Sequence, residues 1–120
     1  MKTREEYTCP LELTHDITKG KWKPIILWQL GKERLSFSAL KKGIIGISEK
    51  MLLEQLQELQ LYDMVGKHQY EGYPLRVEYF LTRRGEKMLQ AISILQEIGI
   101  DIMIEDGKED FLRARGLTKK

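Results

Sequence analysis

The middle of the chain contains helix-forming, turn-forming and strand-forming residues in an order that restricts the possible folds. The spacing of its apolar residues predicts a short helix over Ser36–Lys42 and a longer helix over Ser48–Tyr62, with a glycine-containing turn over Gly43–Ile47 between them. Two short strands are then predicted at Val65–Tyr70 and Arg76–Thr82. This order predicts a mainly α-helical fold with a small β-hairpin, of the winged helix-turn-helix type.

Five positions around this segment have predicted local roles. Ser36 and Ser48 each precede a helix, where a serine hydroxyl can accept a hydrogen bond from a helix-start amide. Asp63 follows the longer helix, and aspartate tolerates the left-handed backbone conformation better than most residues. Thr82 is predicted to cap the last long helix, and Gly85 to let its first turn approach other backbone closely.

The longer helix has two distinct faces. Leu52, Leu56 and Leu59 recur at helical spacing and are predicted to lie in the core. The start of its other face carries polar residues, as expected for a helix that enters the major groove of DNA, which is wide enough to admit one. Four side chains are predicted to reach base edges: Ser48, Glu49, Lys50 and Leu53.

The charge of the chain is unevenly distributed along the sequence. Residues 19–84 contain 12 Lys or Arg and 7 Asp or Glu, a surplus of five positive charges. A basic surface around the helix-turn-helix would attract DNA phosphates, although each such residue taken singly is more often a solvated surface charge. Phosphate contacts are predicted from residues at helix starts, from flanking lysines and from the β-hairpin, which is called the wing below. These residues are Lys21, Lys23, Ser36, Ser38, Lys41, Lys42, Lys67, His68 and Arg76.

Apolar residues in the terminal helices exceed what one domain needs. The last long helix has two neighbouring apolar faces, so one face can cover the core while the other meets a second subunit. A single helix wrapped over its own domain is the alternative. The predicted dimer contacts are Leu11, Ile17, Leu89, Ile92, Leu95, Ile98 and Ile102. We expect one domain over residues 1–120, with a helix-turn-helix at about 22–62, a wing at about 64–82, dimerisation helices at about 10–19 and 83–104, and a polar, frayed tail from Lys108 to Lys120.

Five short motifs are spread along nearly the whole chain: Cys9-Pro10-Leu11-Glu12, Gly20-Lys21-Trp22-Lys23, Phe37-Ser38-Ala39-Leu40, Gly46-Ile47-Ser48-Glu49-Lys50-Met51-Leu52 and Val77-Glu78-Tyr79-Phe80-Leu81-Thr82-Arg83-Arg84-Gly85. Together they resemble the bacterial HxlR family of transcription regulators. The resemblance implies a dimeric winged helix-turn-helix protein that binds palindromic or near-palindromic operators, with the dimer built from the first and last helices.

Cys9 is the only cysteine and stands directly before Pro10. The resemblance implies a redox-sensing or electrophile-sensing role, because some family members sense through a cysteine at this place. A cysteine at a helix start gains thiolate character, whereas Glu12 nearby opposes it. The alternative is a half-buried, unreactive side chain that only contributes to packing.

The sequence lacks the signatures of several other functions. No phosphate-binding glycine loop, paired-carboxylate motif or nucleophile elbow appears, so no enzyme activity and no cofactor are predicted. His15 and His68 have no partners at ligand spacing, so no metal site is predicted. No apolar run could cross a membrane, and a cytoplasmic location is expected. The predicted partners are double-stranded DNA and a second subunit; a small-molecule effector is compatible with the sequence but unspecified, and a winged-helix protein-interaction module without DNA binding is the alternative function.

Overall fold

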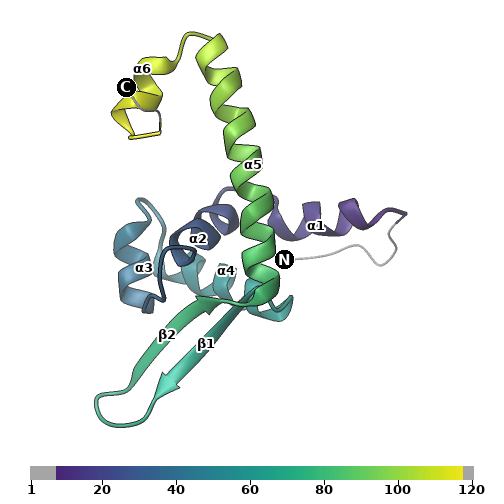
Figure 1. Cartoon of the computed structure of the whole chain (residues 1–120). Coiled ribbons are helices and arrows are strands. Elements are labelled where there is room, and N and C mark those ends of the chain that lie inside the picture. The colour runs from purple at the N-terminus through teal and green to yellow at the C-terminus, as the bar shows by residue number, and fades with distance from the viewer. Residues whose placement is uncertain (1–7, 118–120) are drawn as a thin grey trace. The chain divides into compact units, whose positions relative to one another are not determined.

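The computed structural model describes residues 8–117, which form eight helices and strands (Figure 1). The chain divides into two compact units, one up to Leu89 and one from Gln90. The prediction that residues 1–120 form one domain stays a prediction. In chain order the elements are α1 (Pro10–Thr18), α2 (Trp22–Leu30), α3 (Phe37–Gly43), α4 (Glu49–Leu61), β1 (Val65–Tyr70), β2 (Arg76–Leu81), α5 (Arg83–Glu105) and α6 (Glu109–Ala114).

Local hydrogen bonds fix where the helices of the helix-turn-helix begin. The Ser36 hydroxyl accepts a hydrogen bond from the Ala39 amide at 3.1 Å, and the Ser48 hydroxyl accepts one from the Met51 amide at 3.0 Å. Both predicted caps are therefore confirmed. Asp63, just after α4, has a φ of 58°, which confirms the predicted left-handed turn.

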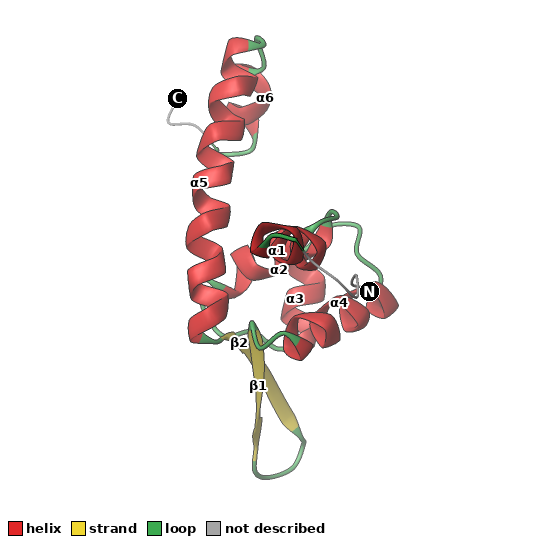
Figure 2. Ribbon diagram, turned by 90° about the vertical axis from the view of Figure 1, so that its right-hand side faces the viewer, coloured by secondary structure: helices red, strands yellow, loops and turns green. Residues whose placement is uncertain are grey.

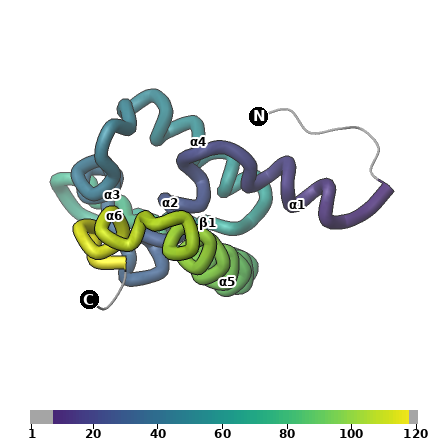
Figure 3. Tube along the Cα trace, turned by 90° about the horizontal axis from the view of Figure 1, so that it is seen from above, coloured from purple at the N-terminus to yellow at the C-terminus, as the bar shows by residue number. Residues whose placement is uncertain are grey.

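The core of the first unit lies mainly between α2 and α4. Ile26 and Leu27 on α2 are fully buried, as are Leu52, Leu56 and Leu59 on α4. The predicted apolar face of α4 is thus confirmed. Figure 3 shows that α1 extends away from α2, α3 and α4, which agrees with burial at the end of α1 and exposure near its start.

The wing is an antiparallel hairpin in which Val65 pairs with Leu81 and Tyr70 pairs with Arg76. Figure 2 shows the hairpin extending away from the helices of its unit. Tyr79 is buried, and its backbone exchanges hydrogen bonds with Leu35 at 2.8 and 3.1 Å. The loop before α3 is therefore attached to the wing, a contact that the sequence did not predict.

The start of α5 lies close to the turn after α4. A Cβ atom at Gly85 would overlap the Met64 carbonyl oxygen, which confirms that only glycine fits this close approach. The Thr82 hydroxyl accepts a hydrogen bond from the Gly85 amide at 3.1 Å and donates one to the Asp63 carbonyl oxygen at 2.6 Å. Thr82 therefore caps α5, as predicted, and also joins α5 to the end of α4.

The predicted frayed tail is wrong for residues 109–114, which form α6. Gly107 ends α5 with a φ of 80°, and the next amide, of Lys108, donates to the Met103 carbonyl oxygen at 2.9 Å. Leu112 on α6 is only 1% exposed. The charged residues of this stretch suggested that it has no helix, but a helix forms and buries one apolar side chain. Residues 118–120 of the predicted tail lie outside the described residues.

Candidate nucleic-acid interface

The exposed face of α4 contains the side chains predicted to read DNA bases. Glu49 and Lys50 are exposed in the first turn, and Leu53 is 44% exposed. Residues three and four apart lie on one helix face, so these three side chains share a surface. Ser48 is also exposed, but its hydroxyl already accepts the capping hydrogen bond and has less freedom to contact a base.

The preceding helix, α3, provides exposed polar groups at both of its ends. Ser38 and Lys42 are exposed, whereas Lys41 is half-buried. Ser36 is half-buried, and its hydroxyl is occupied by the capping hydrogen bond to α3. Of the four predicted phosphate contacts here, Ser38 and Lys42 are therefore the most accessible, together with the backbone amides at the start of α3.

The two lysines at the start of α2 differ in their surroundings. Lys21 is exposed, and its ammonium lies 4.6 Å from the centroid of the Trp22 ring. Lys23 is only 4% exposed and pairs with the Glu58 carboxylate of α4. The predicted contact between Lys23 and a DNA phosphate therefore does not fit the structure, because the ammonium is buried and already has an anionic partner.

The carboxylate of Glu58 responds to this pairing. Burial is the largest single influence and raises the pKa of Glu58, but the opposing influences together, foremost the hydrogen bond and the charge of Lys23, lower that pKa below its ordinary value. Glu58 is thus an anion that stabilises the buried Lys23 ammonium. The sequence missed this role because the two residues lie 35 positions apart.

One face of the wing carries a guanidinium, a carboxylate and two aromatic rings. The Arg76 guanidinium lies 4.4 Å from the Tyr70 ring centroid and 3.4 Å from the Glu78 carboxylate. The Tyr70 hydroxyl donates to Glu78 at 2.8 Å, and this bond, with Arg76, lowers the pKa of Glu78. The ring centroids of His68 and Tyr70 lie 4.5 Å apart, with the ring planes nearly perpendicular. Arg76 and His68 are thus exposed as predicted, but Glu78 partly neutralises Arg76.

The strand register places Lys67 on the other side of the wing from His68, because neighbouring residues of a strand point to opposite faces. Lys67 is exposed, although its cross-strand partner Tyr79 is buried. Arg34 was not predicted, yet its guanidinium lies 4.5 Å from the Phe80 ring centroid of β2. Its neighbour Leu35, which pairs with β2, brings this loop cation to the wing.

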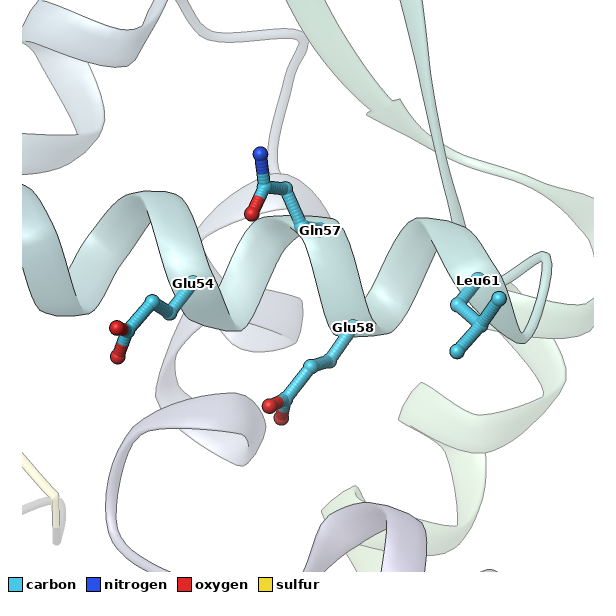
Figure 4. Close-up of a pocket in the computed structure, with 4 residues that line it drawn as sticks. All are labelled: Glu54, Gln57, Glu58 and Leu61. Atoms are coloured by element: carbon cyan, nitrogen blue, oxygen red, sulfur yellow. The ribbon is translucent and has the colours of Figure 1, made fainter. Parts of the chain in front are cut away.

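Beyond its first turn, α4 carries two acidic residues, Glu54 and Glu58. A shallow depression there is lined by Glu54, Gln57, Glu58 and Leu61 (Figure 4). Glu54 and Glu58 point to the same side of the helix, and Gln57 points to a different side. Exposed Glu54 would repel phosphates, whereas Lys23 compensates the charge of Glu58, so this side of α4 is a poor surface for DNA.

The predicted dimer contacts fall into exposed and buried groups. Ile17 is 3% exposed and belongs to the core of the first unit, so it has little surface left for a partner. Leu89 is half-buried and lies so close to Gly31 that a Cβ there would overlap it. Ile92 is half-buried. The remaining predicted contacts are each more than half exposed, as is the additional Ile94: Leu11, Leu95, Ile98 and Ile102.

Cys9 stands at the start of α1 and is partly buried. The Glu12 carboxylate accepts hydrogen bonds from the amides of Thr8 and Cys9 at 2.8 and 3.2 Å. Glu12 therefore places negative charge at the helix start, where an anionic sulfur would otherwise be favoured.

Residues 8–117 contain no group of three or more His, Cys, Asp or Glu side chains that could hold a metal ion. Within the same residues, every helix is too short or too polar to span a membrane.

The sequence profile of the HxlR-like helix-turn-helix family matches residues 17–106. This chain belongs to that family. MalR of Fusobacterium mortiferum is 35% identical over 100 residues, which cover 82% of this chain and 94% of that protein. YkvN of Bacillus subtilis, named an uncharacterized HTH-type transcriptional regulator, is 35% identical over 94 residues, covering 78% of this chain and 77% of YkvN. The chain is therefore a transcriptional regulator of the helix-turn-helix type.

Solved structures agree with the winged-helix fold. The reduced form of the redox regulator HypR has a TM-score of 0.73 and 28% identity, covering 88% of this chain and 99% of that one. The reduced form of the transcriptional regulator YodB from Bacillus subtilis has a TM-score of 0.69 and 27% identity, covering 76% of this chain and 90% of YodB. HypR has also been solved oxidised and YodB after diamide treatment.

Proposed function

We propose that this HxlR-like regulator binds a palindromic or near-palindromic DNA operator as a homodimer, with α4 in the major groove. The main support is the pair of faces on α4, where Leu52, Leu56 and Leu59 are fully buried and Lys50 and Leu53 are exposed. A rigidly held helix with an accessible polar start is what base recognition requires. Each half-site is read by one protomer, and the half-site centres lie about 10 base pairs, or a multiple of that, apart.

Different side chains of the interface have different tasks. Lys50 donates to guanine O6 or N7, whereas Leu53 contacts a thymine methyl group. Ser38, Lys42 and Lys21 contact phosphates, and the wing contacts the backbone or the adjacent minor groove through Lys67, His68 and Arg76. The surplus of positive charge over residues 19–84 supports this division, since phosphate attraction needs a basic surface.

A second subunit is proposed because the second unit exposes a run of large aliphatic side chains on α5. Ile94, Leu95, Ile98 and Ile102 are each more than half exposed. Contiguous exposed apolar surface commonly marks a protein interface. Pairing through α5, together with Leu11 on α1, would present two copies of α4 to the two half-sites.

Binding by Lys50 and Lys42 can be tested with duplex DNA selected from a random pool by the wild-type protein. Lys50→Ala should lower affinity for the selected duplex about tenfold and leave binding to random-sequence DNA nearly unchanged. Lys42→Ala should weaken both and reduce the slope of log affinity against log salt by about 1. Lys87→Ala, which removes an exposed cation from α5, is the matched control and should bind like the wild type.

The proposal fails if the wild-type protein selects no preferred duplex and its DNA binding does not depend on salt. Retention of a protein partner at fixed stoichiometry, without retention on DNA, would then favour the protein-interaction module.

Cys9 is the proposed sensing residue, supported by its position at the start of α1 and by the redox states in which HypR and YodB were solved. Diamide takes two electrons and two protons from two thiols, which join as an intersubunit disulfide or a mixed disulfide with a small thiol. Diamide should change operator affinity of the wild type and not of Cys9→Ser, as measured by fluorescence polarisation. Equal responses of the two proteins would leave Cys9 as a packing residue only.

A further inference from the structure

Lys23 of α2 and Glu58 of α4 form an ion pair at the edge of the core of the first unit. The Lys23 side chain is 5% exposed and that of Glu58 is 19% exposed. Lysine is rarely buried to this extent unless an anion accompanies it, because removing an ammonium from water is costly. The pair joins the helix proposed to read DNA to the central helix of the same unit.

Helix stability does not account for the orientation of this pair. Lys23 lies in the first turn of α2, and Glu58 lies near the end of α4, three residues before Leu61. Helix dipoles favour anions near helix starts and cations near helix ends, so each charge opposes the dipole of its own helix. The pair must therefore be favoured by the contact between the helices.

The rest of the contact between α2 and α4 has little directional character. It includes the aliphatic side chains of Ile26, Leu27, Leu52, Leu56 and Leu59, all fully buried. Aliphatic cores tolerate repacking and small rotations with modest loss of stability, although they lose uniqueness of structure. A charged hydrogen bond between two particular atoms, by contrast, requires one relative orientation.

We propose that Lys23 and Glu58 are a positioning pair, which fixes the rotation of α4 on α2 and thereby aims Glu49, Lys50 and Leu53 at the bases. The consequence for DNA rests on the proposed function, whereas the positioning itself does not. With side chains included, a helix has a radius of about 5–6 Å. A rotation of about 20° would then move the side-chain tips by about 2 Å, more than the spread of hydrogen-bond lengths.

Two double variants separate positioning from stabilisation. Lys23→Met/Glu58→Met replaces the pair with apolar side chains of similar length, a change that is often neutral or stabilising for a buried ion pair. Lys23→Glu/Glu58→Lys restores the pair with reversed charges, which now also agree with both helix dipoles. Single variants are less informative, since each leaves one charge without this partner.

Glu54 provides a matched control on the same helix. It points to the same side of α4 as Glu58 (Figure 4) and is exposed. Glu54→Gln therefore removes one negative charge from this side of α4 without removing the pair with Lys23. If Glu54→Gln and the double methionine variant change helix orientation or DNA preference alike, the local electrostatic field is the cause. If only the double methionine variant changes them, the pair is the cause.

Residual dipolar couplings of backbone amides, measured on the protein without DNA, test the positioning directly. The couplings oscillate along a helix, and their phase reports its rotation about its axis. We expect the phase of α4 relative to α2 to be the same in the wild type, Glu54→Gln and the charge-reversed variant, and to be shifted or blurred in the double methionine variant. An unchanged phase in the double methionine variant overturns the proposal.

Stability and DNA binding complete the experiment. The double methionine variant should unfold at the wild-type urea midpoint or above it, while its preference for the selected duplex over random-sequence DNA falls about tenfold and is restored in the charge-reversed variant. A clearly lower urea midpoint in the double methionine variant would show that the pair stabilises the fold and would overturn a positioning role. If the wild type prefers no duplex, the proposed function fails, but the couplings still decide for or against the positioning pair.

Discussion

The two units of this chain bury their apolar residues to different extents. In the first unit, large aliphatic side chains of α2 and α4 are fully buried, and Leu40 of α3 is fully buried too. In the second unit, Leu112 is well buried, whereas Ile94, Leu95, Ile98 and Ile102 are each more than half exposed. One unit has a closed core, and the other resembles half of an interface.

In the proposed dimer, this difference would give the two units different tasks. A closed core holds α3, α4 and the wing in fixed relation within the first unit, as a reading surface requires. An open apolar surface gives the second unit little stability of its own, since burial of apolar area is the main favourable contribution to folding. The proposed dimer would supply that burial.

The largest effect should come from opening the core of the first unit. Leu56→Ala removes a fully buried side chain of α4 and should lower the free energy of unfolding by about 2–5 kcal/mol, measured by urea denaturation. Leu61→Ala, at an exposed position on the same helix, is the control and should change it by less than about 0.5 kcal/mol. Similar losses in both variants would contradict the closed core.

A smaller effect on folding, but a large one on assembly, should come from the second unit. Ile98→Glu places a charge within the exposed aliphatic surface of α5 and should weaken dimerisation about 100-fold, measured by sedimentation equilibrium. Glu97→Ala changes the adjacent exposed residue and should leave the dimer intact. A monomeric wild type, or a dimer that Ile98→Glu does not weaken, would contradict pairing through this surface.

Much of the first unit could be predicted because short-range rules determine it. Serine caps, the left-handed aspartate and the close approach at Gly85 each depend on a few neighbouring residues, and the structure confirms them. The buried face of α4 follows from the spacing of its leucines in the same way. These features are visible in the sequence because the physical cause and its consequence lie within one or two helical turns.

Other features depend on partners far away in the chain and could not be predicted. From the sequence alone Lys23 is expected to be a surface cation, but the structure pairs it with Glu58. Arg34 is likewise expected to be an ordinary loop residue, but its guanidinium stacks on Phe80 of the wing. The helix α6 was missed for a related reason. Its six residues carry three charges, and only the burial of Leu112 reveals a packed segment.

The smallest expected effect is on stability at acidic pH, and it distinguishes the paired Glu58 from the exposed Glu54 of the same helix. Because Lys23 lowers the pKa of Glu58, the unfolded carboxyl binds a proton at higher pH than the folded one. The stability that ionised Glu58 adds relative to its protonated form is therefore fully present above the ordinary pKa of about 4.5 and is lost as the pH falls through the lower folded value. Glu58→Gln should flatten this part of the dependence of the urea midpoint on pH, whereas Glu54→Gln should leave it unchanged. If both variants show the wild-type slope below pH 4.5, the Lys23–Glu58 pair contributes nothing to acid sensitivity.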